Sequence, residues 1–237
     1  MADTMRGVYT NLTEIRRNVF CEVAKIAYEG GDDQAKKLDE LPYKIIPGDV
    51  ATYRESVFLE RAIVGERIRL TLGLPLQGVD RPEQLSDGLA EAAKPETYYQ
   101  PPLINIIKFA CNACEDNVYR VTNMCQGCLA HPCREICPKG AITFVDKKAH
   151  IDQEKCIHCG QCAKVCPYHA ILHKERPCAS ACGMHAIGSD EHGRAQIDYE
   201  KCVSCGQCLI NCPFGAIADK SQIFQVIQAI NAGDRSE

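Results

Sequence analysis

Residues 156–167 read CIHCGQCAKVCP, and residues 202–213 read CVSCGQCLINCP. The four cysteines have the same spacing in both runs, and a proline follows the last cysteine in each. The residues before the runs also correspond, since IDQEKC at 151–156 matches IDYEKC at 197–202. The chain therefore contains an internal repeat that is organised around cysteine.

Two further cysteine segments are partial copies of these runs. Residues 125–138 read CQGCLAHPCREICP, which is the same run with two extra residues before the third cysteine, and residues 178–182 keep two cysteines. The last cysteine of each partial copy lies 19 or 20 positions before the first cysteine of the complete run that follows. This spacing pairs the copies into two consecutive modules.

The complete runs have the pattern C-x2-C-x2-C-x3-C-P, by which bacterial ferredoxins hold 4Fe-4S clusters. In ferredoxins with two clusters, the fourth cysteine of each run binds the other cluster. Zinc sites usually separate two cysteine pairs by a longer loop, so these runs favour iron–sulfur clusters. Three complete ligand sets are predicted: Cys125, Cys128, Cys133 and Cys166; Cys156, Cys159, Cys162 and Cys137; and Cys202, Cys205, Cys208 and Cys182.

A fourth set is incomplete within the second module. Leu172 and Glu175 stand where two more thiols would be required, and a C-x2-C pair upstream of the first run is unassigned. We expect this pair to complete a fourth 4Fe-4S set. Its members are Cys111, Cys114, Cys178 and Cys212. The alternative is three clusters, with the upstream pair in a small zinc site or simply packed.

Histidines and known motifs add no second chemistry. Four histidines lie in or just after the cysteine runs, where we expect solvated or hydrogen-bonded loop residues because each complete run already has four thiolates. They are His131, His158, His169 and His185. The sequence has no G-x-G-x-x-G fingerprint, P-loop or Ser-His-Asp order, so flavin, nicotinamide and hydrolase chemistry have no support.

Composition places the chain among globular proteins. It has 237 residues, 46% hydrophobic and 24% charged, and its net charge of -4 does not indicate nucleic-acid binding. Residues 1–17 lack the apolar segment of a secretion signal, and the most apolar stretch, 103–111, is too short to span a bilayer. We therefore expect a cytoplasmic protein without a membrane span, in which clustered cysteines are metal ligands rather than disulfides.

The amino-terminal residues have helical periodicity. A first helix is predicted from a capping box at Asn11 and Glu14 to Gly30. Cys21 lies within this helix and is expected to be a core or boundary thiol. A second helix is predicted from a capping box at Thr52 and Glu55, ending at Gly73.

Shorter helices are expected over 82–93 and over 222–230. The predicted fold class is α+β, a helical amino-terminal region followed by two consecutive ferredoxin-like modules of two 4Fe-4S clusters each. The expected divisions are a helical region at 1–94, a linker at 95–110, a first module at 111–172, a second and degenerate module at 173–220, and a carboxy-terminal helix at 221–237. We expect the helical region to pack on the clusters and cover them.

Residues 124–142, 175–183 and 211–224 resemble the amino-terminal iron–sulfur region of FeFe-hydrogenases, in the branch with an extra helical segment before its clusters. The similarity extends from about residue 19 to the last residue. Its most specific features are the insertion in the first run and the phrase Arg-Pro-Cys-x3-Cys-Gly at 176–183. In that family a further domain carries the catalytic H-cluster on additional cysteines, whereas no cysteine follows Cys212 here.

The resemblance implies an electron-conducting module that is not catalytic alone, with no catalytic residues of its own. Its partner would be a ferredoxin-like donor or a hydrogenase catalytic domain. One alternative is a ferredoxin-dependent hydrogenase that is truncated or split before the H-cluster domain. Another is the iron–sulfur subunit of a different oxidoreductase complex, with the helical region as its docking surface.

Overall fold

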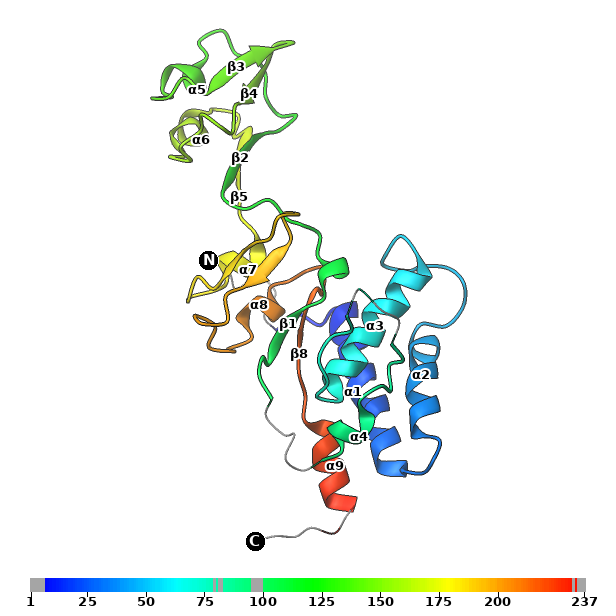
Figure 1. Ribbon diagram of the computed structural model, residues 1–237. Coiled ribbons are helices and arrows are strands. Elements are labelled where there is room, and N and C mark those ends of the chain that lie inside the picture. The colour runs from blue at the N-terminus through cyan, green and yellow to red at the C-terminus, as the bar shows by residue number, and fades with distance from the viewer. Residues whose placement is uncertain (1–6, 79, 81–82, 95–99, 232, 234–237) are drawn as a thin grey trace.

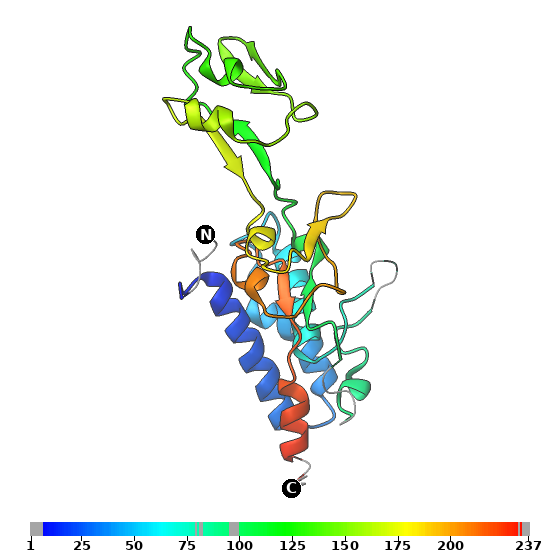
Figure 2. The same cartoon turned by 90° about the vertical axis from the view of Figure 1, so that its left-hand side faces the viewer.

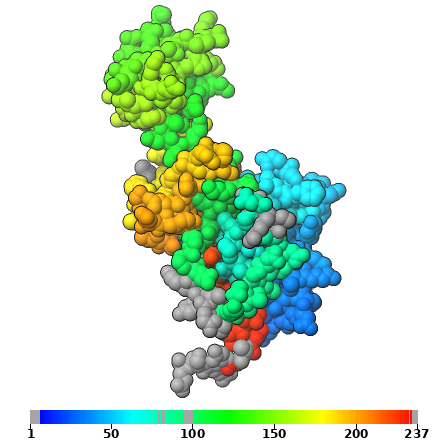
Figure 3. Space-filling model, in the orientation of Figure 1, coloured from blue at the N-terminus to red at the C-terminus, as the bar shows by residue number. Residues whose placement is uncertain are grey.

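The computed structural model describes residues 7–78, 80, 83–94, 100–231 and 233, and these form three parts (Figure 1). A helical bundle is built from both ends of the chain. A cysteine-rich proximal lobe, residues 103–117 and 175–220, packs on the bundle. A distal lobe, residues 118–174, stands away from both at the end of a narrow neck (Figure 3).

The bundle contains five helices within the described residues. They are α1 (Asn11–Glu29), α2 (Gln34–Ile45), α3 (Val57–Thr71), α4 (Leu89–Ala92) and α9 (Ile223–Asn231). Helix α1 packs against α2, α3 and α9, so the last helix of the chain lies alongside the first (Figure 2). No helix in the described part of the chain is long and apolar enough to cross a membrane.

Both predicted capping boxes are wrong in position. Helix α1 is capped by Thr10, whose side chain accepts a hydrogen bond from the Thr13 amide while the Thr13 hydroxyl accepts from the Thr10 amide. Helix α3 is capped by Ser56, four residues after the predicted start at Thr52. The Thr52 amide instead donates to the Glu60 carboxylate, which folds this segment into a loop.

Three further features differ from the expectations. Helix α2 was not predicted, and it contains Pro42 near its end. Of the helix expected over 82–93, only α4 forms, and residue 82 lies outside the described residues. Cys21 is exposed on α1 rather than in the core.

The proximal lobe is made of short elements from two chain segments. They are β1 (Ile104–Ile106), the 3-10 helix η2 (Lys108–Ala110), α7 (Pro177–Ser180), β6 (Ile187–Ser189), β7 (Ala195–Ile197), α8 (Gln207–Ile210) and β8 (Ile217–Asp219). Strand β1 pairs antiparallel with β8, and β6 pairs with β7. Residues 104–110 therefore belong to the lobe, although the sequence assigned them to a linker. Residues 95–99 of that linker lie outside the described residues.

The distal lobe repeats this design. It contains β2 (Val118–Val121), α5 (Pro132–Glu135), β3 (Ile142–Val145), β4 (Lys148–Ile151), α6 (Gln161–Val165) and β5 (Ile171–Lys174). The antiparallel pair β2–β5 forms the neck, where Tyr119 stacks on its cross-strand partner His173 with ring centroids 4.6 Å apart. The lobe has its own apolar core.

Helix α3 joins the bundle to the proximal lobe. Ile63 and Leu70 on this helix pack in the core of the lobe, together with buried cysteines. Val64 and Ile68 pack in the core of the bundle. The bundle therefore directly covers the cysteines of the proximal lobe.

Candidate metal centres

Two cavities in the distal lobe are each lined by four cysteines. Both cavities are small, and their other lining residues are mostly apolar. One cavity is lined by Cys137, Cys156, Cys159 and Cys162, and the other by Cys125, Cys128, Cys133 and Cys166. The structure therefore brings together two of the predicted sets, including the fourth cysteine that each takes from the other run.

The upstream cysteine pair lies in the proximal lobe with the remaining members of the fourth set. Cys178 and Cys212 are buried in the core of the lobe, and Cys111 packs against them. Burial, followed by the nearby Cys212 thiolate, raises the pKa of Cys178 to about 12. Burial also raises the pKa of Cys114, with further contributions from Cys111 and Cys212. These four thiols are thus close enough to affect one another's ionisation.

The remaining set lies in the same lobe. Burial, followed by the neighbouring Cys182, Cys202 and Cys205 thiolates, raises the pKa of Cys208 to about 11. Iron binding would remove the protons of these thiols despite their raised pKa values, since a thiol that coordinates a metal is deprotonated outright.

The upstream pair and the first C-x2-C segment of the runs that begin at Cys125, Cys156 and Cys202 share one backbone feature, a left-handed residue immediately before the second cysteine. These residues are Ala113 (φ 46°), Gly127 (φ 59°), His158 (φ 55°) and Ser204 (φ 56°). Positive φ is uncommon for residues other than glycine. The upstream pair therefore forms a turn of the same type as the three predicted cluster-binding runs.

Four short helices each present one buried cysteine. Helices α5, α6, α7 and α8 carry Cys133, Cys162, Cys178 and Cys208, respectively. Cys178 thus corresponds to the third cysteine of a run. The fourth set then has the same parts as the other three, namely a C-x2-C turn, one cysteine on a short helix and one cysteine from another run.

The turns after the fourth cysteines are also alike. A left-handed residue follows each of these cysteines by three positions: Gly140, His169, His185 and Gly215. In three of these turns the next amide donates to the cysteine sulfur, with N···S distances of 3.3 Å at Cys137, 3.4 Å at Cys166 and 3.3 Å at Cys182. Such amides tune the potential of a bound cluster.

The four histidines beside the runs have a backbone role. All of them adopt left-handed φ values between 46° and 55°, a region in which histidine is enriched several-fold among non-glycine residues. The ring of His131 packs on Phe144, with centroids 3.8 Å apart.

The donor sets fit 4Fe-4S clusters. Among the described residues, no three His, Cys, Asp or Glu side chains converge as ligands of a single metal ion. A 4Fe-4S cluster instead takes four thiolates around a shared inorganic core. Thiols that line an apolar cavity, and whose sulfurs accept hydrogen bonds from backbone amides, match that requirement.

Three arginines that were not predicted from the sequence border the fourth set. Arg176 is buried, with 3% of its surface exposed, and it donates to the Cys114 carbonyl. Arg67 and Arg54 donate to carbonyls in the turn after Cys212. The only signal in the sequence is that Arg176 belongs to the Arg-Pro-Cys phrase at 176–183.

Comparison with known proteins identifies the repeated segments. Residues 149–172 and 195–218 match the model of the 4Fe-4S binding domain. An uncharacterized ferredoxin of Methanocaldococcus jannaschii is 42% identical over 53 residues, which are 22% of this chain and 32% of that protein. The electron transport protein HydN of Escherichia coli K12 is 37% identical over 83 residues, which are 35% of this chain and 42% of HydN.

A third relative belongs to the ion-translocating oxidoreductase complex of Methanosarcina acetivorans. This protein is 49% identical over 47 residues, which are 20% of this chain and 17% of the relative. The present chain thus spans less than half the length of these relatives. The matches show ferredoxin-type 4Fe-4S domains and homology to iron–sulfur electron transport proteins.

Proposed function

We propose that this chain relays single electrons, with four 4Fe-4S clusters held by the sixteen cysteines between Cys111 and Cys212. When bound, such clusters accept and donate one electron each, at potentials that burial and hydrogen bonds to sulfur adjust. The distal lobe would be one complete ferredoxin-like module. The proximal lobe, with the upstream pair, would be the second.

The main support for a fourth cluster is the left-handed turn that its cysteine pair shares with the three predicted runs. Ala113 takes the same conformation before Cys114 as Gly127, His158 and Ser204 take in the predicted runs. The Cys111 sulfur also accepts a backbone hydrogen bond, from Ala195 at 3.3 Å. A pair that was merely packed would require neither feature.

The distal lobe is the proposed docking site for a redox partner. Leu129 follows Cys128 and is 95% exposed, and Met124 precedes Cys125 and is also exposed. The narrow neck holds the distal lobe, which carries both side chains, away from the bundle (Figure 3). Replacing Leu129 with glutamate should slow reduction of the loaded protein by a soluble ferredoxin and leave its reduction by dithionite unchanged.

Metal analysis tests the proposal directly. Anaerobically reconstituted protein should contain about sixteen iron atoms per chain, show a brown colour that dithionite bleaches, and give paramagnetic signals of interacting clusters. Cys114→Ala should lower the iron content by about four atoms, while the control Cys21→Ala should leave it unchanged. About twelve iron atoms in the unaltered chain would contradict the fourth cluster. A colourless protein that contains zinc would contradict the iron–sulfur proposal as a whole.

The resemblance to FeFe-hydrogenases favours a hydrogenase catalytic domain as the partner. The chain, reduced by dithionite, should then support hydrogen evolution when a separately produced H-cluster domain is added. It should evolve none from reduced dye by itself. A domain that accepts no electrons from the chain would contradict a hydrogenase partner. The similarity to a protein of an ion-translocating oxidoreductase complex would then favour a partner of that kind, which anaerobic affinity purification would test.

A further inference from the structure

Buried positive charge is concentrated beside one of the four cysteine sets. Three arginines in the described part of the chain are at most 4% exposed: Arg67, Arg69 and Arg176. Arg69 binds loop carbonyls within the bundle. The other two border the set that contains Cys111, Cys114, Cys178 and Cys212.

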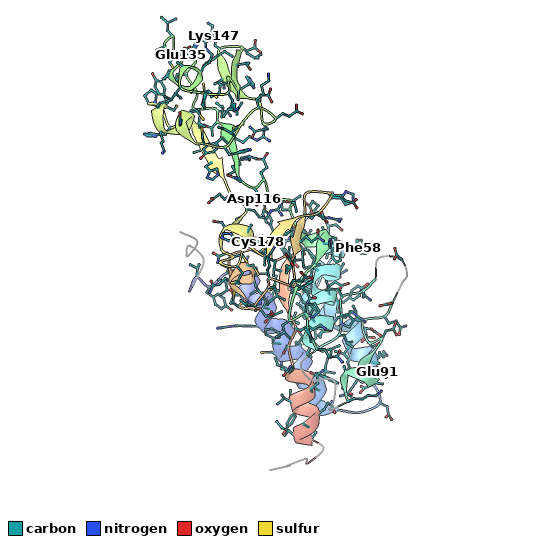
Figure 4. All side chains as sticks on the ribbon, turned by 60° about the vertical axis from the view of Figure 1, so that its left-hand side comes forward. Phe58, Glu91, Asp116, Glu135, Lys147 and Cys178 are labelled. Atoms are coloured by element: carbon teal, nitrogen blue, oxygen red, sulfur yellow. The ribbon has the colours of Figure 1, made fainter. Side chains whose placement is uncertain are left out.

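Arg176 lies where the chain returns from the distal lobe, two residues before Cys178, which Figure 4 labels together with Asp116. Its guanidinium donates to the Cys114 carbonyl at 2.8 Å, the Gly188 carbonyl at 2.9 Å and the Gly193 carbonyl at 2.8 Å. All these partners are neutral backbone groups. Among the described residues, the guanidinium forms no ion pair, and the nearby Asp116 carboxylate accepts instead from the Arg176 backbone amide at 3.0 Å.

Two arginines from the helical part of the chain bind backbone carbonyls near the same set. Arg54 donates to the Ala110 carbonyl at 3.1 Å and to the Phe214 carbonyl, so it bridges the residues next to Cys111 and Cys212. Arg67 donates to the Gly215 carbonyl. Burial lowers the pKa of Arg67 to about 10, so the side chain remains protonated at neutral pH.

The distal lobe has no equivalent among its described residues. Arg134 is solvent-exposed and paired with Glu135 at the far end of the lobe, where Figure 4 also shows Lys147. Solvent screens exposed charges far more than buried ones. The two lobes therefore surround similar cysteine sets with different electrostatic environments.

We propose that Arg176, assisted by Arg67 and Arg54, raises the reduction potential of the cluster held by Cys111, Cys114, Cys178 and Cys212. This inference rests on the proposed fourth cluster. Uptake of one electron from an external reductant adds one negative charge, and a fixed nearby cation favours the more negative state. Burial of the set acts in the opposite direction, since low polarity disfavours added charge. The arginines counter that effect and bias electrons toward the proximal lobe.

The test is an anaerobic redox titration of the loaded chain with dithionite, followed by paramagnetic resonance. Arg176→Met should shift one cluster to a more negative potential, with a roughly tenfold loss in its reduction equilibrium, or about 59 mV for one electron. Arg176→Lys keeps the charge, so the potential of that cluster should stay close to its value in the unaltered chain. Arg69→Met, an equally buried arginine within the bundle, is the matched control and should change no potential.

Cys114→Ala identifies which cluster gives the shifted paramagnetic signal, because this variant should abolish the signal that Arg176→Met shifts. If Arg176→Met loses iron, Arg67→Met carries the same test, because it removes one cation without touching the Cys114 carbonyl. Sixteen iron atoms with no shift in either variant would refute the arginine effect alone. Twelve iron atoms in the unaltered chain would refute the fourth cluster, and this inference with it.

Discussion

Single residues set the geometry of the cysteine turns. Nine non-glycine residues in the described chain have positive φ, and six of them lie in cysteine turns: Ala113, His131, His158, His169, His185 and Ser204. A left-handed L-residue costs roughly 1–2 kcal/mol. The fold accepts this cost repeatedly at the points where thiols must face a common cavity.

Gly127 is the turn residue that space restricts most. Its φ is 59°, and a Cβ atom there would lie 1.9 Å from the Lys147 carbonyl oxygen. Gly127→Ala should therefore displace Cys128 and reduce the iron content by about four atoms or more. Iron analysis and thermal unfolding would measure the effect.

Gly140 provides the matched control, since its φ is 57° but nothing lies within 4 Å of its added Cβ. Gly140→Ala should keep all its iron and lose about 1–2 kcal/mol of stability. Equal iron losses in the two variants would show that backbone conformation, and not the contact with Lys147, limits the turn.

The spacing of the cysteines predicted the two sets that line the distal cavities, whereas the fourth set was predicted by assigning the one pair left over. The rule that exchanges the fourth cysteine depends only on order along the chain. The same reasoning could not find Arg176 or Arg54, because both act on backbone carbonyls of residues far away in sequence. No residue type marks those carbonyls.

At the scale of the element, α3 was predicted as a helix, but its burial on all sides was not. Every residue from Ile63 to Thr71 is buried, including Glu66, Arg67 and Arg69. A helix buried on all sides has no polar face, so its periodicity is weak. Its charged side chains bind loop backbone instead of facing water.

Glu60 organises the loop before α3. Its carboxylate accepts from the amides of Thr52 at 2.7 Å and Arg54 at 2.9 Å, which positions the Arg54 side chain. Glu60→Ala should destabilise the fold by roughly 1–3 kcal/mol, because amides lose their acceptor. Glu60→Gln keeps an acceptor oxygen and should lose less. Denaturant unfolding would compare both with Glu55→Ala, an exposed residue of the same loop; similar losses in all three would contradict this role.

Glu66 gives α3 a pH-dependent contribution. Burial raises the pKa of this carboxyl, against the opposing effect of the Gln77 amide, which donates to it at 3.0 Å. The neutral form is thus favoured in the fold. Its contribution to stability is fully present below the unfolded pKa of about 4.3 and is lost as pH rises through the folded value.

Glu66→Gln should therefore be more stable than the unaltered chain at neutral pH, and this advantage should shrink as pH falls toward 4. Denaturant midpoints between pH 4 and 8 would measure it. Glu40→Gln, an exposed change on α2, should show no such trend. A constant difference across this range would exclude titration of Glu66 as the cause.

At the scale of the whole molecule, the distal lobe is an insertion in the proximal one. The chain leaves after Asn117 and returns at Glu175, and β2 pairs with β5, so that Val118 lies opposite Lys174. The lobe also has its own core. The sequence predicted two modules in succession but not that one interrupts the other, because the insertion is revealed by long-range contacts such as the pairing of β1 with β8 and the packing of Cys111 on the proximal core.

Replacing residues 118–174 with a short Gly-Ser linker should leave the proximal lobe intact. The ends to be joined already lie side by side, so little loop-closure entropy is required. The iron content should fall from about sixteen to about eight atoms, with a cooperative thermal transition retained. An insoluble chain, or one with much less iron, would show that the lobes depend on each other.

The same insertion has a consequence for biosynthesis. All eight proposed ligands of the distal lobe have been translated once Cys166 is made, whereas the proximal lobe waits for Cys212 even though its first cysteine is Cys111. Helix α9, which closes the bundle against α1, is translated later still. A nascent chain would thus complete its outer lobe on the ribosome while the earliest of the proposed ligands, Cys111 and Cys114, still await their partners. Those two thiols are exposed longest to oxidation and to competing metals before the fold closes over them.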